Sequence, residues 1–415
     1  MAAAAATAAV IAVAACSAGS HPAAGRSTPP ATASGGTAPS PAPATPVARA
    51  PGCSTATAPA PALRTVPAPM APVPSSPFGV AVTADGRWSF VALTGSGSVG
   101  VFRVRGPGVP SLARQVLVGP EPLGEALTRD GRYLLVADGG GGAAVISVSR
   151  AESGAAGAVL GTLSAPTGSG AIEVTTSPDG RFAFVSLEDS AAIAVFNLQR
   201  ALARGFGAAD FVGTIPAGMA PVGVAVSPDG RWLYATSELA SGARPSPGLL
   251  GGEGTLTVIS VRRAETDPAG SVVSTVQAGC SPVRVITSAD GGVVWVTARE
   301  SDRLLGFSAA RLLTDPAGSI VASVEVGEAP VGLALVDGGT RIVVADSNRF
   351  GAAGAASSLA VVNVAAALAN RPALAGYLPA GGFPREMALE PGGRTLLVGN
   401  FSSQQLEAVG VAGLP

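Results

Sequence analysis

A turn that recurs seven times along the chain constrains the fold more than any other feature of the sequence. In each copy an alternating apolar stretch leads into a turn that ends on glycine, and a second apolar stretch follows, as in the segment 221–236, PVGVAVSPDGRWLYAT. The turn glycines are Gly86, Gly131, Gly180, Gly230, Gly291, Gly339 and Gly393. Their spacings of 45, 49, 50, 61, 48 and 54 residues indicate a repeat architecture.

The apolar residues within each repeat recur with a period of two, which predicts strands rather than helices. One stretch precedes the turn, a second follows it, and two more come before the next repeat. The predicted second strands are residues 88–93, 133–137, 182–187, 232–236, 293–297, 341–345 and 395–399. Four short antiparallel strands per repeat are typical of a propeller blade. The sequence therefore predicts an all-β fold, a seven-bladed β-propeller with four-stranded antiparallel blades.

The seventh repeat reaches the end of the chain with only three apolar stretches, so its fourth strand must come from elsewhere. The stretch Ala62-Leu63-Arg64-Thr65-Val66 lies before the first repeat. We expect this N-terminal segment to complete the last blade and so to remove an open sheet edge. The propeller is accordingly predicted to span residues 62–415.

The N-terminal region has the composition of an export signal followed by a tether. Residues 1–15 are almost all alanine and valine and end at Cys16 in a lipobox-like VAAC sequence, which predicts residues 1–16 as a signal and Cys16 as a lipidation site. No basic residue precedes the apolar run, so ordinary secretion is the alternative. Residues 17–61 are rich in Pro, Ala, Ser and Gly and cannot bury a core. The predicted location is the outer side of a bacterial cytoplasmic membrane or the cell surface, with a lipid anchor as the sole membrane contact.

Two further cysteines, Cys53 and Cys280, remain if Cys16 carries a lipid. An even pair in an exported protein permits one disulfide, and two free thiols are the alternative. Catalysis by either cysteine is not expected, because the only histidine of the chain, His21, lies in the predicted tether.

The charge of the chain excludes one class of partner. Its 26 basic residues are all arginine, its acidic residues number 27, and its net charge is −1. No basic surface for nucleic acid is therefore expected. A monomer is predicted, with a protein, glycan or small-molecule ligand as the partner.

Alignment of the repeats on the turn glycine shows one position in the first strand that is glycine in four repeats and charged in three. The charged exceptions are Glu173, Arg284 and Glu386. Their neighbours in the same region are Glu125 and Arg385. In a four-stranded blade this position and the end of the second strand share one face, so we expect these side chains at the mouth of the central channel. The second-strand ends add the polar candidates Asp138, Asp346 and Asn400.

Two interpretations of this polar face remain open. In the first, Arg284 pairs with Glu173 or Glu386 across the channel as part of a solvated rim. In the second, the face is a ligand site, because propeller mouths are concave and bring polar groups together. No cofactor is predicted, although carboxylates with asparagine would suit Ca²⁺ or Mg²⁺. An enzymatic version would use Glu173 or Glu386 as the base and Arg284 as an oxyanion or carboxylate clamp.

The repeat resembles the YVTN-type β-propeller repeat, whose motif runs roughly P-x-G-V-A-V-S-P-D-G-x-x-L-Y-V-T-N. The resemblance covers residues 77–410, and the final tetrapeptide is degenerate, with YATS at 234–237 and LVGN at 397–400. The family includes exported bacterial surface proteins and lactonase-like seven-bladed propellers. The resemblance implies this architecture, and as activities a binding or scaffold role or, alternatively, metal-assisted lactone hydrolysis. Lactonase-like propellers usually employ a histidine, which the predicted propeller of this chain lacks.

Overall fold

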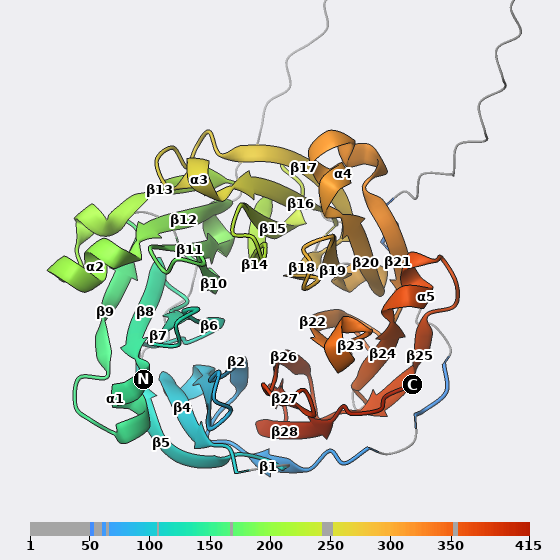
Figure 1. The fold of residues 1–415 in the computed structure, drawn as a ribbon, viewed down its shortest axis with the longest axis horizontal. Helices are drawn as coiled ribbons and strands as arrows, with labels where there is room; N and C mark the ends of the chain where they lie inside the picture. Colours follow the sequence, from blue (N-terminus) through green and yellow to red (C-terminus); the bar gives the residue numbers. More distant parts are fainter. Residues whose placement is uncertain are drawn as a thin grey trace, which may run out of the picture. The chain divides into compact units, whose positions relative to one another are not determined.

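The chain forms seven four-stranded antiparallel sheets arranged as blades around a central axis (Figure 1). This computed structural model describes residues 50–53, 60–63, 66–105, 108–166, 169–242, 252–351 and 356–415. The predicted seven-bladed propeller is confirmed. The predicted signal with Cys16, His21 and most of the predicted tether lie outside the described residues. No helix in the described ranges is long and apolar enough to cross a bilayer.

Each blade runs from a strand at the axis to a strand at the rim, and the strands follow the order of the chain. The first strands are β2 (Pro77–Val82), β6 (Glu125–Leu127), β10 (Ala171–Thr176), β14 (Met219–Val226), β18 (Pro282–Thr287), β22 (Pro330–Val336) and β26 (Pro384–Leu389). The second strands are β3 (Trp88–Leu93), β7 (Tyr133–Ala137), β11 (Phe182–Leu187), β15 (Trp232–Leu239), β19 (Val293–Ala298), β23 (Arg341–Asp346) and β27 (Thr395–Asn400). All seven begin at the predicted residue, and none ends more than three residues beyond its predicted end.

The outer half of each blade has the same regularity. The third strands are β4 (Ser98–Arg103), β8 (Gly142–Ser147), β12 (Ala192–Asn197), β16 (Glu253–Ser260), β20 (Arg303–Ser308), β24 (Ser358–Asn363) and β28 (Gln405–Gly410). The fourth strands are β5 (Ser111–Leu117), β9 (Val159–Ser164), β13 (Phe211–Pro216), β17 (Val272–Cys280), β21 (Ile320–Glu325) and β25 (Leu374–Pro379), with β1 (Met70–Pro72) as the outermost strand of the seventh blade. Large apolar side chains such as Phe90, Phe184 and Trp295 are fully buried, and each contributes about 1.5–3 kcal/mol to folding.

The recurring turn has a specific hydrogen-bond pattern that explains its sequence. In the first blade the Thr83 hydroxyl donates to Asp85 at 2.6 Å, and Asp85 accepts the backbone N–H of Arg87 at 3.0 Å. Gly86 between them has a φ of 66°, which a residue with a side chain rarely adopts. The turns of the next four blades repeat the hydroxyl–aspartate contact. The spacing of hydroxyl, aspartate and glycine is therefore what ends the first strand and starts the second.

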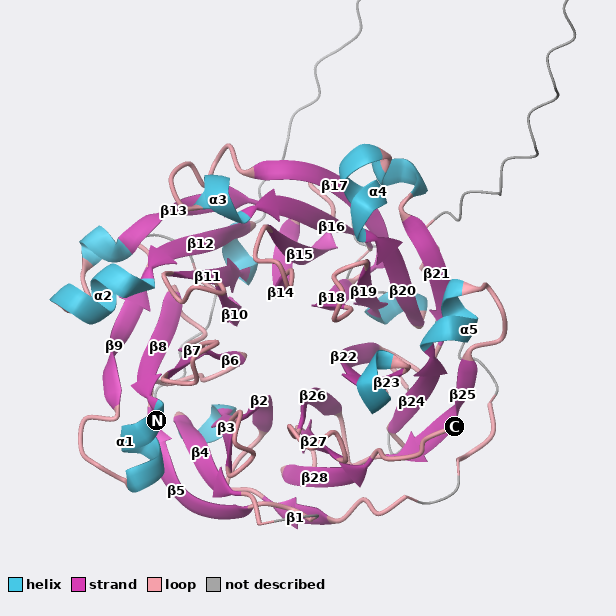
Figure 2. Ribbon diagram, in the orientation of Figure 1, coloured by secondary structure: helices cyan, strands magenta, loops and turns pink. Residues whose placement is uncertain are grey.

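Short helices join the third and fourth strands of blades two to six, a feature that the sequence analysis did not predict (Figure 2). They are α1 (Val148–Ser153), α2 (Leu198–Arg204), α3 (Val261–Ala264), α4 (Ala309–Thr314) and α5 (Val364–Leu368). The last residue of the preceding strand is Ser or Asn in every case, and in four cases its side chain accepts a backbone N–H of the first turn. A serine or asparagine at the end of these five third strands was thus the available signal.

A disulfide fastens the N-terminal arm, by which we mean residues 50–53, 60–63 and 66–72, to the propeller. Cys53 is bonded to Cys280 at the end of β17. Beside this bond the Ser301 hydroxyl donates to the carbonyl of Gly52 at 3.1 Å. The alternative of two free thiols is therefore not what the structure contains, and the arm begins its path at the fourth and fifth blades.

The arm closes the last blade, but through a different segment from the predicted one. β1 pairs with β28, with Met70 opposite Glu407, so the N-terminal strand is confirmed. The prediction of Ala62–Val66 as that strand is wrong, because Ala62 bridges to Tyr377 in β25 of the sixth blade. The residues Arg64 and Thr65 lie outside the described ranges. The reason is the disulfide: an arm fastened at Cys280 passes the edge of the sixth blade before it reaches the seventh.

Candidate functional site

The first strands place two residues of each repeat at the axis through a local irregularity. In six blades the register between the first and second strands shifts at this point, as between Pro221 and Val224. The shift leaves two residues, here Val222 and Gly223, outside the regular pairing. Val222 is buried in an apolar cluster with its counterparts from the two following blades, Val283 and Val331. Ile172 and Phe383, which are close in the chain to Glu173 and Arg385, pack against this cluster.

The glycines of the aligned position are required by close contact between blades. A Cβ on Gly332 would lie 1.8 Å from the carbonyl oxygen of Arg385, and one on Gly223 would lie 2.4 Å from that of Val283. At Gly124 the nearest atoms are those of the Glu173 carboxylate, 2.4 Å from such a Cβ. Glycine therefore lets adjacent blades approach, and in the second blade it also makes room for a charged side chain of the third.

Glu125, Glu173, Arg284, Arg385 and Glu386 gather at the axis, and we call them the central charge cluster. Arg284 Nη2 lies 2.9 Å from Glu173 Oε1, and Arg284 Nε donates to Glu386 Oε1. Arg284 is only 6% exposed. The guanidinium of the fifth blade thus connects carboxylates of the third and seventh blades, and it pairs with both of the partners that the sequence offered as alternatives.

Arg385 is held in a different way, by aromatic rings. Its guanidinium carbon lies 3.8 Å from the ring centroid of Phe78, 5.3 Å from that of Phe383 and 5.4 Å from that of Phe401. Among the described residues no carboxylate lies within 4 Å of this guanidinium. Burial, followed by repulsion from Arg284, lowers the pKa of Arg385 to about 9. The rings provide a cation–π contact, which stabilises the charge without neutralising it.

The pKa values of two carboxyl groups of the cluster, Glu125 and Glu173, are shifted in the opposite sense. Burial raises the pKa of Glu173 to about 8, although Arg284 acts to lower it. Burial also raises the pKa of Glu125 well above its usual range, and the nearby Glu173 and Glu386 add to the rise. Burial of both Glu125 and Glu173 therefore favours their protonated forms. The charge of the cluster therefore depends on pH.

A second layer of charges lies nearer the mouth, at the ends of the second strands. Arg299 Nη2 is 2.8 Å from Glu238 Oε2, and its guanidinium lies 5.9 Å from the ring of Phe350. Arg349 is exposed, and within the described part of the chain no carboxylate lies within 4 Å of it. Arg349, Phe350 and the three rings around Arg385 are not among the site residues predicted from the sequence. Arg349 and Phe350 lie three and four residues after the end of β23, and this short distance from a second strand was a usable signal.

Three of the predicted site residues lie apart from the central charge cluster. Asp138 accepts the backbone N–H groups of Gly140 and Gly142 within its own loop. Asp346 accepts the Ser358 hydroxyl at 3.0 Å, and Asn400 donates to Glu407 at 2.8 Å. In the described ranges no interaction joins these three side chains to the cluster. They support the loops of the second, sixth and seventh blades.

The donor set for a divalent cation is not found in the described residues, where no three His, Cys, Asp or Glu side chains come close enough to hold an ion. The reason is visible at Glu173 and Glu386. The Arg284 guanidinium stands between these two carboxylates and occupies the place that a cation would take. The residues present thus fit Ca²⁺ or Mg²⁺ poorly.

Comparison with known proteins gives a family and a set of structural neighbours. The family model described as "Lactonase, 7-bladed beta-propeller" matches residues 62–331. A hydrazine synthase from Kuenenia stuttgartiensis aligns with a TM-score of 0.64 at 18% identity, over 82% of this chain and 97% of that one. A crystal structure of a mitotic checkpoint complex gives a TM-score of 0.64 at 15% identity, over 85% and 97%. Curated protein sequences give no match. At these identities the structural likeness shows the fold alone.

Proposed function

The chain belongs to the lactonase family of seven-bladed β-propellers, and we propose that it is a binding protein whose channel mouth holds a small polar ligand through an anionic group. The ligand carries a carboxylate or a phosphate. It contacts Arg385 and Arg349, and the other members of the central charge cluster fix the shape of the mouth. The seven blades supply a rigid frame and the second-strand loops supply the contacts.

The observation that carries this proposal is the unequal pairing of four arginines. Arg284 and Arg299 each have a carboxylate within 4 Å, whereas Arg349 and Arg385 have none among the described residues. Arg284, Arg349 and Arg299 all act to lower the pKa of Arg385. An anion bound between the two unpaired guanidinium groups would offset this repulsion and accept charge-assisted hydrogen bonds.

Calorimetric titration with inorganic phosphate and with gluconate tests the site. We expect binding to the wild-type protein, and about a tenfold weaker affinity in Arg349→Ala and in Arg385→Lys, since each variant loses one guanidinium contact of about 1.4 kcal/mol. Arg303→Ala is the matched control, because Arg303 is an arginine of β20 with its own partner, Glu325. Absence of heat with both anions, or equal affinity in all four proteins, would overturn the proposal.

We also propose that the propeller is displayed outside the cell on a lipid anchor at Cys16. The apolar run, the VAAC sequence and the Pro-rich tether support this, and the disulfide Cys53–Cys280 fits an oxidising compartment. Metabolic labelling with a palmitate analogue should mark the wild-type protein and leave Cys16→Ser unlabelled. Labelling of both proteins, or of neither, would contradict the proposal of a lipid anchor at Cys16.

Lactone hydrolysis is the second candidate function, and one feature of the site favours it beyond the family match. Glu173, with its pKa raised to about 8, lies beside the Arg284 guanidinium, so a protonatable base and a cationic clamp are already adjacent. A sugar lactone is the substrate to assay. Turnover that falls at least about a hundredfold in Glu173→Gln would make the protein a hydrolase. No turnover by the wild type, together with anion binding, would leave the binding role.

A further inference from the structure

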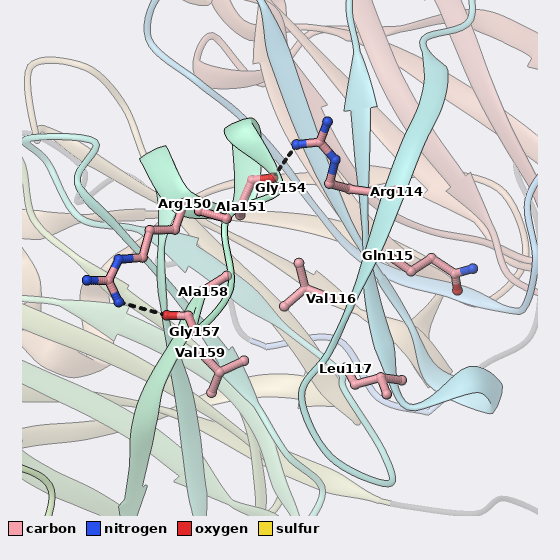
Figure 3. A pocket seen from close by; sticks show the side chains of 11 residues that line it. Arg114, Gln115, Val116, Leu117, Arg150, Ala151, Gly154, Gly157, Ala158 and Val159 are labelled. Carbon is pink, nitrogen blue, oxygen red and sulfur yellow. Dashed lines mark hydrogen bonds between the residues drawn. The ribbon is translucent and has the colours of Figure 1, made fainter.

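We propose that a groove at the outer rim, between β5 and α1, is a docking site for an extended acidic peptide segment of a partner protein. The groove has a volume of about 500 Å³. Its apolar wall includes Val116 and Leu117 of β5 with Ala158 and Val159 at the start of β9, and arginines stand at its border (Figure 3). The site is separate from the channel mouth and independent of the function proposed there.

The groove exists because one position of β5 departs from the pattern of the other blades. At the residue where the third and fourth strands change register, the fourth strand has a small side chain in five blades: Gly161, Gly213, Ser274, Ala322 and Gly376. The first blade has Arg114 at this position. A small residue here lets a neighbouring segment settle onto the strand, and an arginine does not.

The contacts at the other blades show what the small residue permits. A Cβ on Gly161 would lie 2.2 Å from the ring of Phe206, and one on Gly376 would lie 2.5 Å from the carbonyl oxygen of Pro61 in the N-terminal arm. The Ser274 hydroxyl donates to the carbonyl of Leu312 in α4 at 2.6 Å. At the first blade, by contrast, Arg114 reaches across and donates from its guanidinium to the carbonyl of Ala151 at 3.0 Å. The length of this side chain keeps α1 away from β5 and leaves the groove between them.

The uncovered strand has the properties of an edge that accepts another strand. β5 pairs with β4 on one side, and within the described residues no backbone hydrogen bond reaches its other side. Leu117 is 77% exposed and Leu112 is 41% exposed. Edge strands are commonly protected by proline, charge or a covering segment, and β1 at the seventh blade has Pro67, Pro69 and Pro72 in or beside it. β5 contains no proline, so an extended peptide can add to it by backbone pairing.

The charges at the border indicate an acidic occupant. Arg114 and Arg150 donate to backbone carbonyls, Arg150 to that of Gly157 at 3.1 Å, and neither has a carboxylate within 4 Å among the described residues. Both positive charges are thus uncompensated beside an apolar wall. A second copy of the chain fits less well, because antiparallel self-pairing of β5 about its middle residue would place two Arg114 side chains opposite each other.

Fluorescence anisotropy with a labelled seven-residue peptide that alternates glutamate and valine tests the groove. We expect saturable binding that weakens with salt, and at least about tenfold weaker binding in Arg150→Glu and in Leu117→Asp. The matched controls are Arg204→Glu in α2 and Val273→Asp in β17, which are exposed rim positions outside the groove. A third variant, Arg114→Ser, introduces the residue of the fourth blade and should close the groove.

Three outcomes would overturn the proposal. The first is no anisotropy change up to about 1 mM protein, far above the range of specific complexes. The second is equal binding by a peptide that alternates lysine and valine. The third is a dimer of the wild-type protein in sedimentation that Leu117→Asp dissociates, which would make a second copy the occupant. Phosphate binding at the channel mouth is measured in the same variants. Because the two sites are separate, this binding can be retained or lost independently of peptide binding in the groove.

Discussion

The axis and the rim of the propeller use arginine in opposite ways. At the axis Arg284 is buried between the carboxylates of Glu173 and Glu386, and its charge is matched. At the rim Arg114 and Arg150 donate to backbone carbonyls beside exposed leucines, and their charges are unmatched. A buried, matched charge connects blades to one another, whereas a charge without a carboxylate partner, as on the half-buried Arg114 and the exposed Arg150, is free to act on another molecule. Burial and ion pairing therefore distinguish arginines that maintain the fold from arginines that are available for recognition.

Removal of the axial cation should have the largest effect. In Arg284→Leu two buried carboxylates lose their partner, and we expect the free energy of unfolding to fall by about 3–5 kcal/mol. Urea denaturation followed by tryptophan fluorescence measures the change. The triple variant with Glu173→Gln and Glu386→Gln should recover much of the loss, because no unpaired charge then remains. A decrease of less than about 1 kcal/mol in the free energy of unfolding of Arg284→Leu would mean that the ion pairs at the axis contribute little to stability.

Loss of the disulfide should have the next largest effect on stability. It tests whether the N-terminal arm stabilises the rim through its covalent bond to β17. Replacement of Cys280 by serine frees the N-terminal arm that closes the seventh blade, and we expect a decrease of about 2–4 kcal/mol in the free energy of unfolding. Dithiothreitol should lower the wild-type urea midpoint to that of the variant and leave Cys53→Ser with Cys280→Ser unchanged. If the reductant acts equally on both proteins, the arm is held by its strand contacts alone.

The pH dependence of stability should also originate at the axis. Burial raises the folded-state pKa of Glu173 to about 8 from its usual value near 4.5, so the folded state binds the proton more tightly than the unfolded state. Stability is then greatest below the lower pKa and is lost as the pH rises through the higher one, by at most about 1.4 kcal/mol per pH unit for one group. Melting temperatures between pH 5 and pH 8 should fall, and the fall should be shallower in Glu173→Gln. Glu325→Gln at the rim is the control, and an equal slope in both variants would assign the dependence to other groups.

The fold could be predicted from the sequence because its signals are local. In five of the seven turns a hydroxyl, an aspartate and a glycine make their contacts within a few residues, as Thr83, Asp85 and Gly86 do, so the pattern appears directly in the chain. The partner of the N-terminal segment depended on Cys53 and Cys280, which are 227 residues apart. Nothing local distinguishes a strand that pairs with the sixth blade from one that pairs with the seventh, and the predicted segment was assigned to the wrong blade.

The candidate site was predicted only where a repeat departs from its neighbours. Comparison of equivalent positions found Glu173, Arg284 and Glu386, and the same comparison applied to the fourth strands would have found Arg114. It could not find the rings of Phe78, Phe383 and Phe401 around Arg385, because they come from the first and last blades and meet only when the ring closes. Nor could it show that Asp138, Asp346 and Asn400 form hydrogen bonds within their own blades. Alignment of the repeats therefore identifies residues that differ from their equivalents, and the fold determines which of these residues come into contact.

The smallest expected effect is the coupling energy of an ion pair at the rim, between Arg303 and Glu325. Arg303 Nη2 pairs with Glu325 Oε1 across β20 and β21, with the two side chains 26% and 49% exposed. Solvent screens this pair, so a double-mutant cycle with Arg303→Ala and Glu325→Ala should give a coupling energy of about 0.2–1 kcal/mol, and less in high salt. The corresponding cycle on Arg284 and Glu173 should give a larger, less salt-dependent value, because Arg284 is almost fully buried. Equal coupling energies in the two cycles would show that burial does not distinguish the axis from the rim, and the difference between structural and available arginines would then have to rest on their partners alone.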